Sequence, residues 1–276
     1  FLLAGFGIGG LAFGATTVGL GYLPKSVVAI LLIGGATATF AYIVHARRTP
    51  NPLLDLRLFS QPTFRLSVTG GFLFRIGVGA LPFLLPLLLQ LGFGMTPFQS
   101  GLITFATALG SMSMKAVVPA ILLRFGFRMT LVWNAVISSV FIAACAAFAP
   151  GTPVVVMMAV LVIGGFFRSL EFTCINTIAY ADVDRRTMSR ATSIVSVAQQ
   201  LSVSTGVAIG ALAVELATNW AGTPQITAAD FPPAFLFVGA LSMSSALFFA
   251  RLAPDAGAEL ARRTPGPTGP ADQRMG

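Results

Sequence analysis

The chain has 276 residues, of which 55% are apolar and only 9% are charged. A soluble domain typically has about 25% charged residues, so this composition excludes the soluble globular class and indicates a membrane protein. The net charge of +8 does not predict nucleic-acid binding, because the basic residues flank apolar segments, where they face anionic lipid.

Eight apolar segments follow one another, each near or above the roughly 20 residues that cross a bilayer as a helix. We call them spans one to eight, and they cover residues 2–20, 27–44, 64–91, 99–123, 129–148, 154–180, 192–219 and 233–250. The sequence therefore predicts an all-α polytopic membrane protein with about eight transmembrane helices. Because the chain opens at Phe1, inside an apolar span and without Met or a basic leader, we expect a fragment of a longer protein.

Basic residues concentrate on every second connection between the spans. Of the 17 Lys and Arg residues, 13 lie near the connections two–three, four–five and six–seven or after span eight, whereas the opposite connections have only Lys25. Basic connections stay on the cytoplasmic side. The odd-numbered spans therefore run outward, and the carboxy terminus is predicted to be cytoplasmic.

The chain divides into four predicted regions. Residues 1–48 hold a pair of spans without interior charge, and 49–63 form a cytoplasmic linker rich in Pro and Arg. We expect this linker to lie on the membrane surface, with its leucines toward lipid and its arginines toward headgroups. Residues 64–251 form a six-helix bundle, and the Ala/Gly/Pro/Arg-rich residues 252–276 are predicted to be disordered.

Two glycine motifs match formally, and they predict helix packing and not a nucleotide site. The glycines of residues 5–10 fit GxGxxG formally, but they lie inside span one and not at a strand-to-helix turn, which argues against a nucleotide site. GxxxG spacing, which favours close helix packing, is the better reading for the pairs Gly5/Gly9, Gly10/Gly14 and Gly206/Gly210.

Cys145 and Cys174 lie in different spans and are expected to pack as small apolar residues. With no Walker loop, HExxH, nucleophile elbow or metal-ligand spacing, we expect no enzyme, cofactor or metal.

Ionisable side chains inside a bilayer cost roughly 2.5–3.5 kcal/mol each and are candidates for function. Four stand out because they lie away from the span ends: Arg75, Lys115, Arg168 and Glu171. Lys115 has an alternative reading, in which it extends to the cytoplasmic interface. Arg168 and Glu171 are three residues apart and so share a helix face. They form either a structural ion pair or, as we slightly prefer, a pair that also lines a cavity.

A local pattern recurs in spans three and six. Residues 70–75 (Gly-Gly-Phe-Leu-Phe-Arg) are similar to residues 164–168 (Gly-Gly-Phe-Phe-Arg). Spans three to five and six to eight would then form an inverted repeat, with Arg75 and Arg168 meeting near the midplane. Coincidence is the alternative, because Gly and Phe are abundant.

Neutral polar residues add hydrogen-bonding groups at membrane depth, and the main candidates for a substrate or proton pathway are Gln90, Asn176 and Gln199. Prolines at 82, 86 and 119 are expected to bend spans three and four. Spans five and eight have no interior charge, which predicts peripheral helices that face lipid.

Several runs of residues match a known pattern: 75–83, Pro86, 89–90, 97–98, Gly101, 110–115, 124–128, 168–170, 176–177 and 199–202. These runs resemble the major facilitator superfamily, and within it the fourteen-helix EmrB/QacA drug/proton antiporter branch and its MdtD-like members. The resemblance implies two linker helices followed by the second six-helix bundle. It further implies that spans three and six line a central cavity, that four and seven lie beside them, and that the membrane is a bacterial inner membrane.

The chain also departs from the family pattern. The connection after span four resembles the D-R-x-G-R/K loop of the family, which makes Arg124, Gly126 and Arg128 gate-loop candidates, but Leu123 occupies the Asp position. The resemblance implies that the acidic proton carriers lie in an absent amino-terminal bundle. Glu171 is the single deep carboxylate in this chain.

These features predict a secondary active exporter of drugs or amphipathic compounds that exchanges them for protons by alternating access. The expected partners are the bilayer, the amino-terminal bundle of the same chain, protons and a small-molecule substrate. Three buried bases against one deep acid favour an alternative substrate class, organic anions or metal–acid chelates. A further alternative is a membrane scaffold or sensor that transports nothing.

Overall fold

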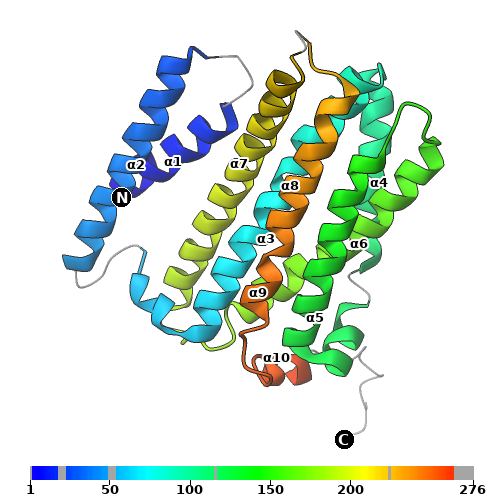
Figure 1. Ribbon diagram of the computed structural model, residues 1–276. Coiled ribbons are helices and arrows are strands. Elements are labelled where there is room, and N and C mark those ends of the chain that lie inside the picture. The colour runs from blue at the N-terminus through cyan, green and yellow to red at the C-terminus, as the bar shows by residue number, and fades with distance from the viewer. Residues whose placement is uncertain (1, 18–22, 49–53, 115–116, 223–224, 264–276) are drawn as a thin grey trace, which may run out of the picture.

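The computed structural model describes residues 2–17, 23–48, 54–114, 117–222 and 225–263. Helices and turns make up these residues, and no strand occurs among them, so the predicted all-α class is confirmed. Two helices precede a helical bundle (Figure 1). The amino-terminal pair is α1 (Leu2–Thr17) and α2 (Lys25–Arg48), and a short 3-10 turn, η1 (Leu56–Ser60), leads into the bundle.

Seven helices build the bundle. They are α3 (Pro62–Leu87), which continues into a π-turn (Leu88–Gly92), α4 (Pro97–Met114), α5 (Val118–Ala144), α6 (Val154–Ile178), α7 (Met188–Ala221), α8 (Phe231–Met243) and α9 (Ser245–Phe249). Helices α8 and α9 follow one another as one rod (Figure 1), and the stretch Ala228–Phe249 that holds them is counted as one membrane-length helix. The connections α3–α4, α5–α6 and α7–α8 lie at one end, and η1 with the other connections lies at the opposite end.

Six of the eight predicted spans coincide with described helices that are long and apolar enough to cross a membrane: Lys25–His45, Pro62–Gly92, Val118–Ala147, Val154–Ile178, Met188–Ala221 and Ala228–Phe249. The other two predicted spans are helical but do not reach that standard. Helix α1 has 16 described residues and α4 has 18, with Ser and Thr along its length.

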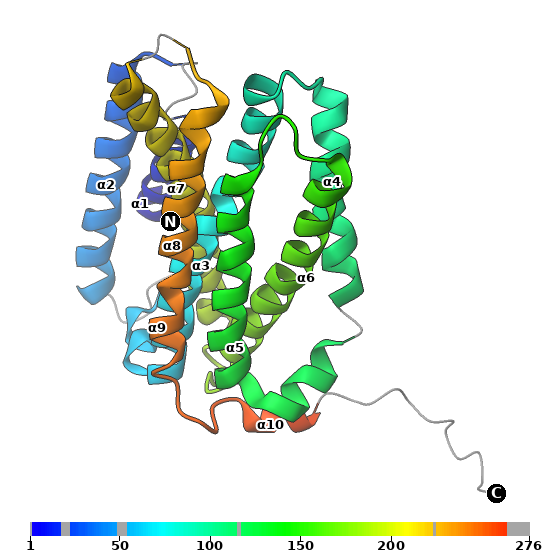
Figure 2. The same cartoon turned by 45° about the vertical axis from the view of Figure 1, so that its right-hand side comes forward.

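The boundary between predicted spans four and five is wrong. We predicted one span over 99–123, but α4 ends at Met114 and a new helix begins at Val118. This helix, α5, changes direction at Gly126, where φ is 70° and ψ is 171°. Its first part crosses the base of the bundle, and its second part spans it (Figure 2). Residues 118–125 are apolar because they cover the buried base, which their sequence does not distinguish from a membrane span.

Glycines bring two helix pairs into close backbone contact. A Cβ at Gly206 of α7 would collide with the backbone of α3 at Ile76, and a Cβ at Gly165 of α6 would collide with the backbone of α4 at Thr107. These contacts hold α3 against α7 and α4 against α6. Small residues permit such approaches between membrane helices.

The GxxxG prediction is partly correct. Gly206 and Gly210 both lie against α3, and Gly10 and Gly14 both face α2. A Cβ at Gly5 or Gly9, however, would meet no atom within 4 Å. Both cysteines are buried and free, as expected for packing residues.

The tail after Leu252 also differs from the expectation of disorder. Leu252 is 2% exposed, and α10 (Ala258–Arg263) packs beneath the first part of α5 (Figure 2). Leu260 and Ala256 join Phe127 of α5 in one apolar cluster. These few apolar side chains order a segment whose composition alone indicates disorder. The remainder of the predicted tail, 264–276, lies outside the described residues.

Candidate functional site

Arg75 of α3 lies inside the bundle and is 1% exposed. Its Nη2 donates a hydrogen bond of 2.7 Å to Oδ1 of Asn176 on α6, and its guanidinium lies 5.2 Å from the ring centroid of Phe172 on the same helix. Gly71, one turn earlier on α3, makes this arrangement possible, because a Cβ there would lie 2.8 Å from Nη1 of Arg75. The arginine is thus held by an amide and an aromatic face.

Glu171 of α6 is 0% exposed. Its Oε2 accepts a hydrogen bond of 2.8 Å from Nδ2 of Asn134 on α5, and the same Nδ2 donates to the carbonyl of Phe167 at 2.8 Å. Within the described residues, Oε1 of Glu171 and Oδ1 of Asn134 have no hydrogen-bond partner. The carboxyl group is therefore deeply buried, with a neutral amide as its direct partner.

Arg75, Asn134, Glu171 and Asn176 together form what we call the buried polar cluster, contributed by α3, α5 and α6. Glu171 is near enough to act electrostatically on Arg75, but among the described residues the single ion pair within 4 Å is Arg190–Asp55, at 3.3 Å, which lies outside this cluster. The two opposite charges therefore share one core without direct contact. Both side chains are buried, at 1% and 0% exposed, and the reading in which Glu171 also lines a cavity stays a prediction.

The predicted Arg168–Glu171 ion pair is wrong. The two side chains share a helix face but extend to different neighbours. Arg168 lies beside Ser138 of α5, Cys145 just after α5 and Leu81 of α3, whereas Glu171 bonds to Asn134. A shared helix face therefore does not bring the two charges into contact.

The two arginines of the proposed repeat also have different surroundings. Arg75 bonds to α6 at Asn176, and Arg168 lies against α5. Their residue patterns are similar, but their contacts are not, and a meeting of the two guanidinium groups stays a prediction.

The other pathway candidates lie apart from the buried polar cluster. Lys115 falls outside the described residues. Gln90, in the π-turn that ends α3, places its Nε2 3.5 Å from Oγ of Ser100 on α4, near the far end of the bundle. Gln199 is half-buried on α7, and its backbone carbonyl accepts a hydrogen bond of 2.8 Å from the Ser202 hydroxyl.

The gate-loop candidates lie at the kink of α5, where Gly126 has non-helical φ and ψ, and their role at a gate stays a prediction. Arg124 is exposed at the end of the first part of α5, with its guanidinium 5.6 Å from the ring centroid of Phe125. Gly126 makes the change of direction, and Arg128 is half-buried just after it. A positive φ favours glycine over other residues. Gly126 is therefore the residue of this group with a definite structural role.

Sequence reasoning missed two residues of the site. It placed α5 among the peripheral helices because no charge lies in its interior, but Asn134 is the direct partner of Glu171. An amide in the middle of an apolar span was the available signal. Phe172 was missed because an aromatic residue gives no signal among 24 phenylalanines. Among the described residues, no group of three or more His, Cys, Asp or Glu could hold a metal.

The chain has recognisable relatives. It is similar to proteins named "Putative multidrug resistance protein MdtD" from Pectobacterium atrosepticum (36% identity over 86% of this chain and 51% of the relative) and Pectobacterium carotovorum (37% over 70% and 41%). A third, from Salmonella paratyphi B, is 38% identical over 66% of this chain and 39% of the relative. The chain thus spans about half the length of these curated relatives, or less.

The family match covers the bundle. Residues 67–272 match the family described as the Major Facilitator Superfamily, and this stretch includes all four members of the buried polar cluster. Polytopic all-α architecture agrees with that match. The chain therefore belongs to the Major Facilitator Superfamily.

Proposed function

We propose that the full-length protein is a proton-coupled exporter of drugs or other amphipathic compounds that works by alternating access. This chain would supply two linker helices and the second six-helix bundle of a fourteen-helix transporter of the EmrB/QacA branch in a bacterial inner membrane. The match covers only 39–51% of the length of the relatives, which supports an additional amino-terminal bundle. Basic residues at the η1 end of the bundle support a cytoplasmic orientation for that end.

The observation that carries the proposal is the burial of Glu171 beside Asn134. A buried carboxylate without an ionised partner in contact is costly, and a proton on the group removes that cost. The same carboxyl can lose its proton when water reaches it or when Arg75 moves closer. Ionisable groups at membrane depth commonly form proton relays. We therefore assign proton exchange to Glu171 and electrostatic control of that exchange to Arg75.

Helix motion would connect this exchange to transport. Asn176, which holds Arg75, and Asn134, which holds Glu171, lie on different helices, α6 and α5. A rocking motion that shifts α6 against α5 and α3 would change the separation of Arg75 and Glu171. Proton binding would then favour one bundle conformation over the other, as coupling requires.

Organic anions or metal–acid chelates are a second substrate class. Arg75 supports it, because no carboxylate lies within 4 Å of this guanidinium among the described residues. The nearly complete burial of Arg75 favours amphipathic compounds instead, since an anion could not reach it in this conformation. Competition of transport by small carboxylates, but not by lipophilic cations, would favour the anion class.

A scaffold or sensor without transport is the alternative from another class. The relatives argue against it, because the match covers only 39–51% of their length and alternating access needs a second bundle. Intact mass and amino-terminal sequencing of the native polypeptide distinguish the two. A native start near residue 1 would favour the scaffold.

The test of proton coupling uses the full-length protein in proteoliposomes under an imposed pH gradient. Glu171→Gln keeps the acceptor for Asn134 and removes the exchangeable proton. We expect gradient-driven transport to be lost while substrate exchange without a gradient is kept. Glu215→Gln, at an exposed position on α7, is the matched control. Unchanged gradient-driven transport in Glu171→Gln would refute the assignment.

A further inference from the structure

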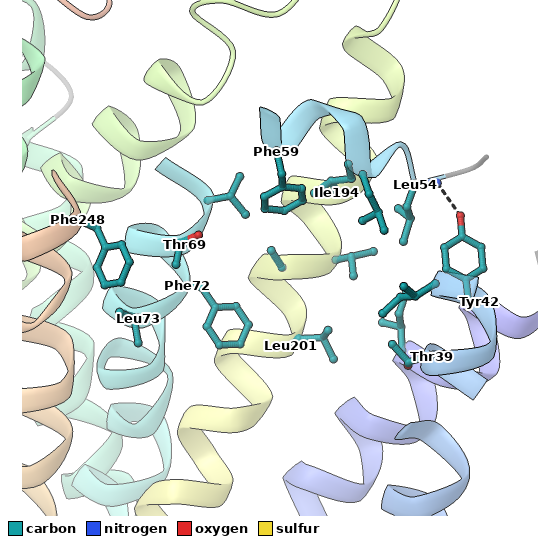
Figure 3. Close-up of a pocket in the computed structure, with 16 residues that line it drawn as sticks. Thr39, Tyr42, Leu54, Phe59, Thr69, Phe72, Leu73, Ile194, Leu201 and Phe248 are labelled. Atoms are coloured by element: carbon teal, nitrogen blue, oxygen red, sulfur yellow. Dashed lines mark hydrogen bonds between the residues drawn. The ribbon is translucent and has the colours of Figure 1, made fainter. Parts of the chain in front are cut away.

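A cavity of about 480 Å³ separates the amino-terminal helix pair from the bundle near η1 (Figure 3). One wall is made by Thr39 and Tyr42 of α2, and the other by side chains of α3 and α7, including Phe72 and Leu201. Its volume falls within the roughly 300–1,000 Å³ of ligand pockets. The cavity contains none of the buried polar cluster, so it is not part of the proposed proton site.

The walls of this cavity are suited to hydrocarbon. Its lining is aliphatic and aromatic except for two threonine hydroxyls and the Tyr42 hydroxyl, and Tyr42 already accepts a hydrogen bond of 2.7 Å from the backbone N–H of Leu54. Water gains few hydrogen bonds in such a space, and apolar cavities stay dry. Because α2, α3 and α7 are all membrane-length helices, the hydrocarbon at hand is the lipid around them.

Among the described residues, arginines lie at one rim of the cavity. Arg65 is exposed on α3 and precedes the lining residues Val68, Thr69 and Phe72 by three, four and seven positions, a spacing that places them on one helix face. Arg190 likewise precedes the lining residues Ile194 and Val197 of α7 by four and seven positions. The positive charge is therefore aligned with the cavity along both helices.

The acidic groups near this rim do not cancel its charge. Asp55 pairs with Arg190 at 3.3 Å, whereas Arg57, beside the lining residue Leu56, is exposed. Asp182 lies near Thr63. Thr63 and Arg65 are two residues apart on α3, so at 100° per residue their side chains leave the helix axis about 200° apart. Arg57 and Arg65 thus leave the rim with a net positive charge.

We propose that this cavity binds an anionic phospholipid, with an acyl chain in the apolar space and the phosphate at Arg57 and Arg65. Basic pockets between membrane helices on the cytoplasmic side are known to take anionic headgroups. The lipid would fill the space between α2 and the bundle and so fasten the linker helices to α3 and α7. This proposal does not rest on proton coupling.

The test is lipid retention by the full-length protein, measured by native mass spectrometry after reconstitution with equal amounts of phosphatidylglycerol and phosphatidylcholine. We expect phosphatidylglycerol to be retained preferentially. Arg65→Gln should weaken its retention about fivefold, since one basic residue near a membrane surface contributes about that factor. Arg124→Gln, at an exposed arginine on the other side of the base, is the matched control and should change nothing.

A second variant tests the apolar half of the site. Ala198→Trp fills the cavity and should remove the retained lipid whatever its headgroup, while Leu236→Trp, at an exposed position on α8, should not. Equal retention of the two lipids by the wild type would overturn the headgroup assignment. Unchanged retention in Ala198→Trp, or a wild type with no bound lipid because another segment fills the space, would overturn the site.

Discussion

Arg75 and Arg168 follow nearly the same residues, Gly-Gly-Phe and one or two more, yet they reach different surroundings. Arg75 is 1% exposed, bonded to Asn176 and covered by Phe172. Arg168 is half-buried beside Cys145 and Ser138. The difference arises from the opposing segment, because α6 presents an amide to Arg75, whereas a hydroxyl of α5 and the thiol just after α5 lie beside Arg168.

A shared local sequence therefore does not give the two arginines a shared role. A buried cation requires partners that satisfy its donors, and these come from other parts of the chain. Arg75 is connected to the one deep carboxyl through electrostatics within the buried polar cluster. We therefore expect function to depend strongly on Arg75 and weakly on Arg168.

The largest expected effect is that of Arg75→Met in the full-length protein. Met is long and uncharged, so it fills much of the space while removing the cation. Efflux should fall by more than about tenfold, within the usual range of coupling energies. Thermal stability should be kept or raised, because burying an unpaired charge is costly. Retained efflux in a folded Arg75→Met protein would contradict the assignment.

Gly71→Ala should have the next largest effect. Its Cβ would lie 2.8 Å from Nη1 of Arg75 and 2.7 Å from Cγ2 of Ile175, so it displaces the guanidinium without changing any charge. Overpacking of this kind costs about 1–3 kcal/mol, and a thermal melt of the purified protein measures it. Gly101→Ala is the control, since a Cβ there meets nothing within 4 Å and alanine favours a helix.

Arg168→Gln should have a smaller effect than Arg75→Met or Gly71→Ala. Its half-buried side chain has no carboxylate within 4 Å among the described residues, and glutamine keeps a hydrogen-bonding group there. We expect a stability change of about 1 kcal/mol or less and efflux close to that of the wild type. A loss of efflux as large as that of Arg75→Met would restore the symmetric reading of the two arginines.

The last prediction concerns the stability of the base of the bundle. Gly126→Ala places a Cβ at φ 70° and ψ 171°, a conformation essentially restricted to glycine, which costs on the order of 1–3 kcal/mol, and the melting temperature should fall accordingly. Arg124→Gln is its neighbour control and should change stability by less than about 0.5 kcal/mol, because its side chain is exposed. Equal melting temperatures for the two variants would mean that the bend at Gly126 does not form.

Hydropathy was sufficient to predict most of the fold. Six predicted spans coincide with described membrane-length helices, and Arg75 and Glu171 were found because charge inside an apolar span is costly. The break at Met114 was missed because residues 118–125 are apolar for another reason, since they cover the base of the bundle. The helix at Ala258–Arg263 was missed because composition does not reveal that Leu260 packs against α5.

The direction of side chains was the part of the site that the sequence could not supply. Spacing correctly placed Arg168 and Glu171 on one face of α6. The two side chains nevertheless have different neighbours, Ser138 for Arg168 and Asn134 for Glu171. Asn134 was missed because a neutral amide costs less in a membrane than a charge and so gives a weaker signal. Partner choice across helices depends on packing between α3, α5 and α6, which no local pattern contains.

Proton release on substrate binding tests most directly whether Glu171 exchanges the transported proton. Substrate would be added to the detergent-solubilised full-length protein in a weak buffer, with a pH-indicator dye as the readout. If Glu171 exchanges the proton, the wild type and Glu215→Gln release protons. Glu171→Gln releases none, although this variant binds substrate. Release of equal size from Glu171→Gln would show that another group carries the proton and would contradict the account.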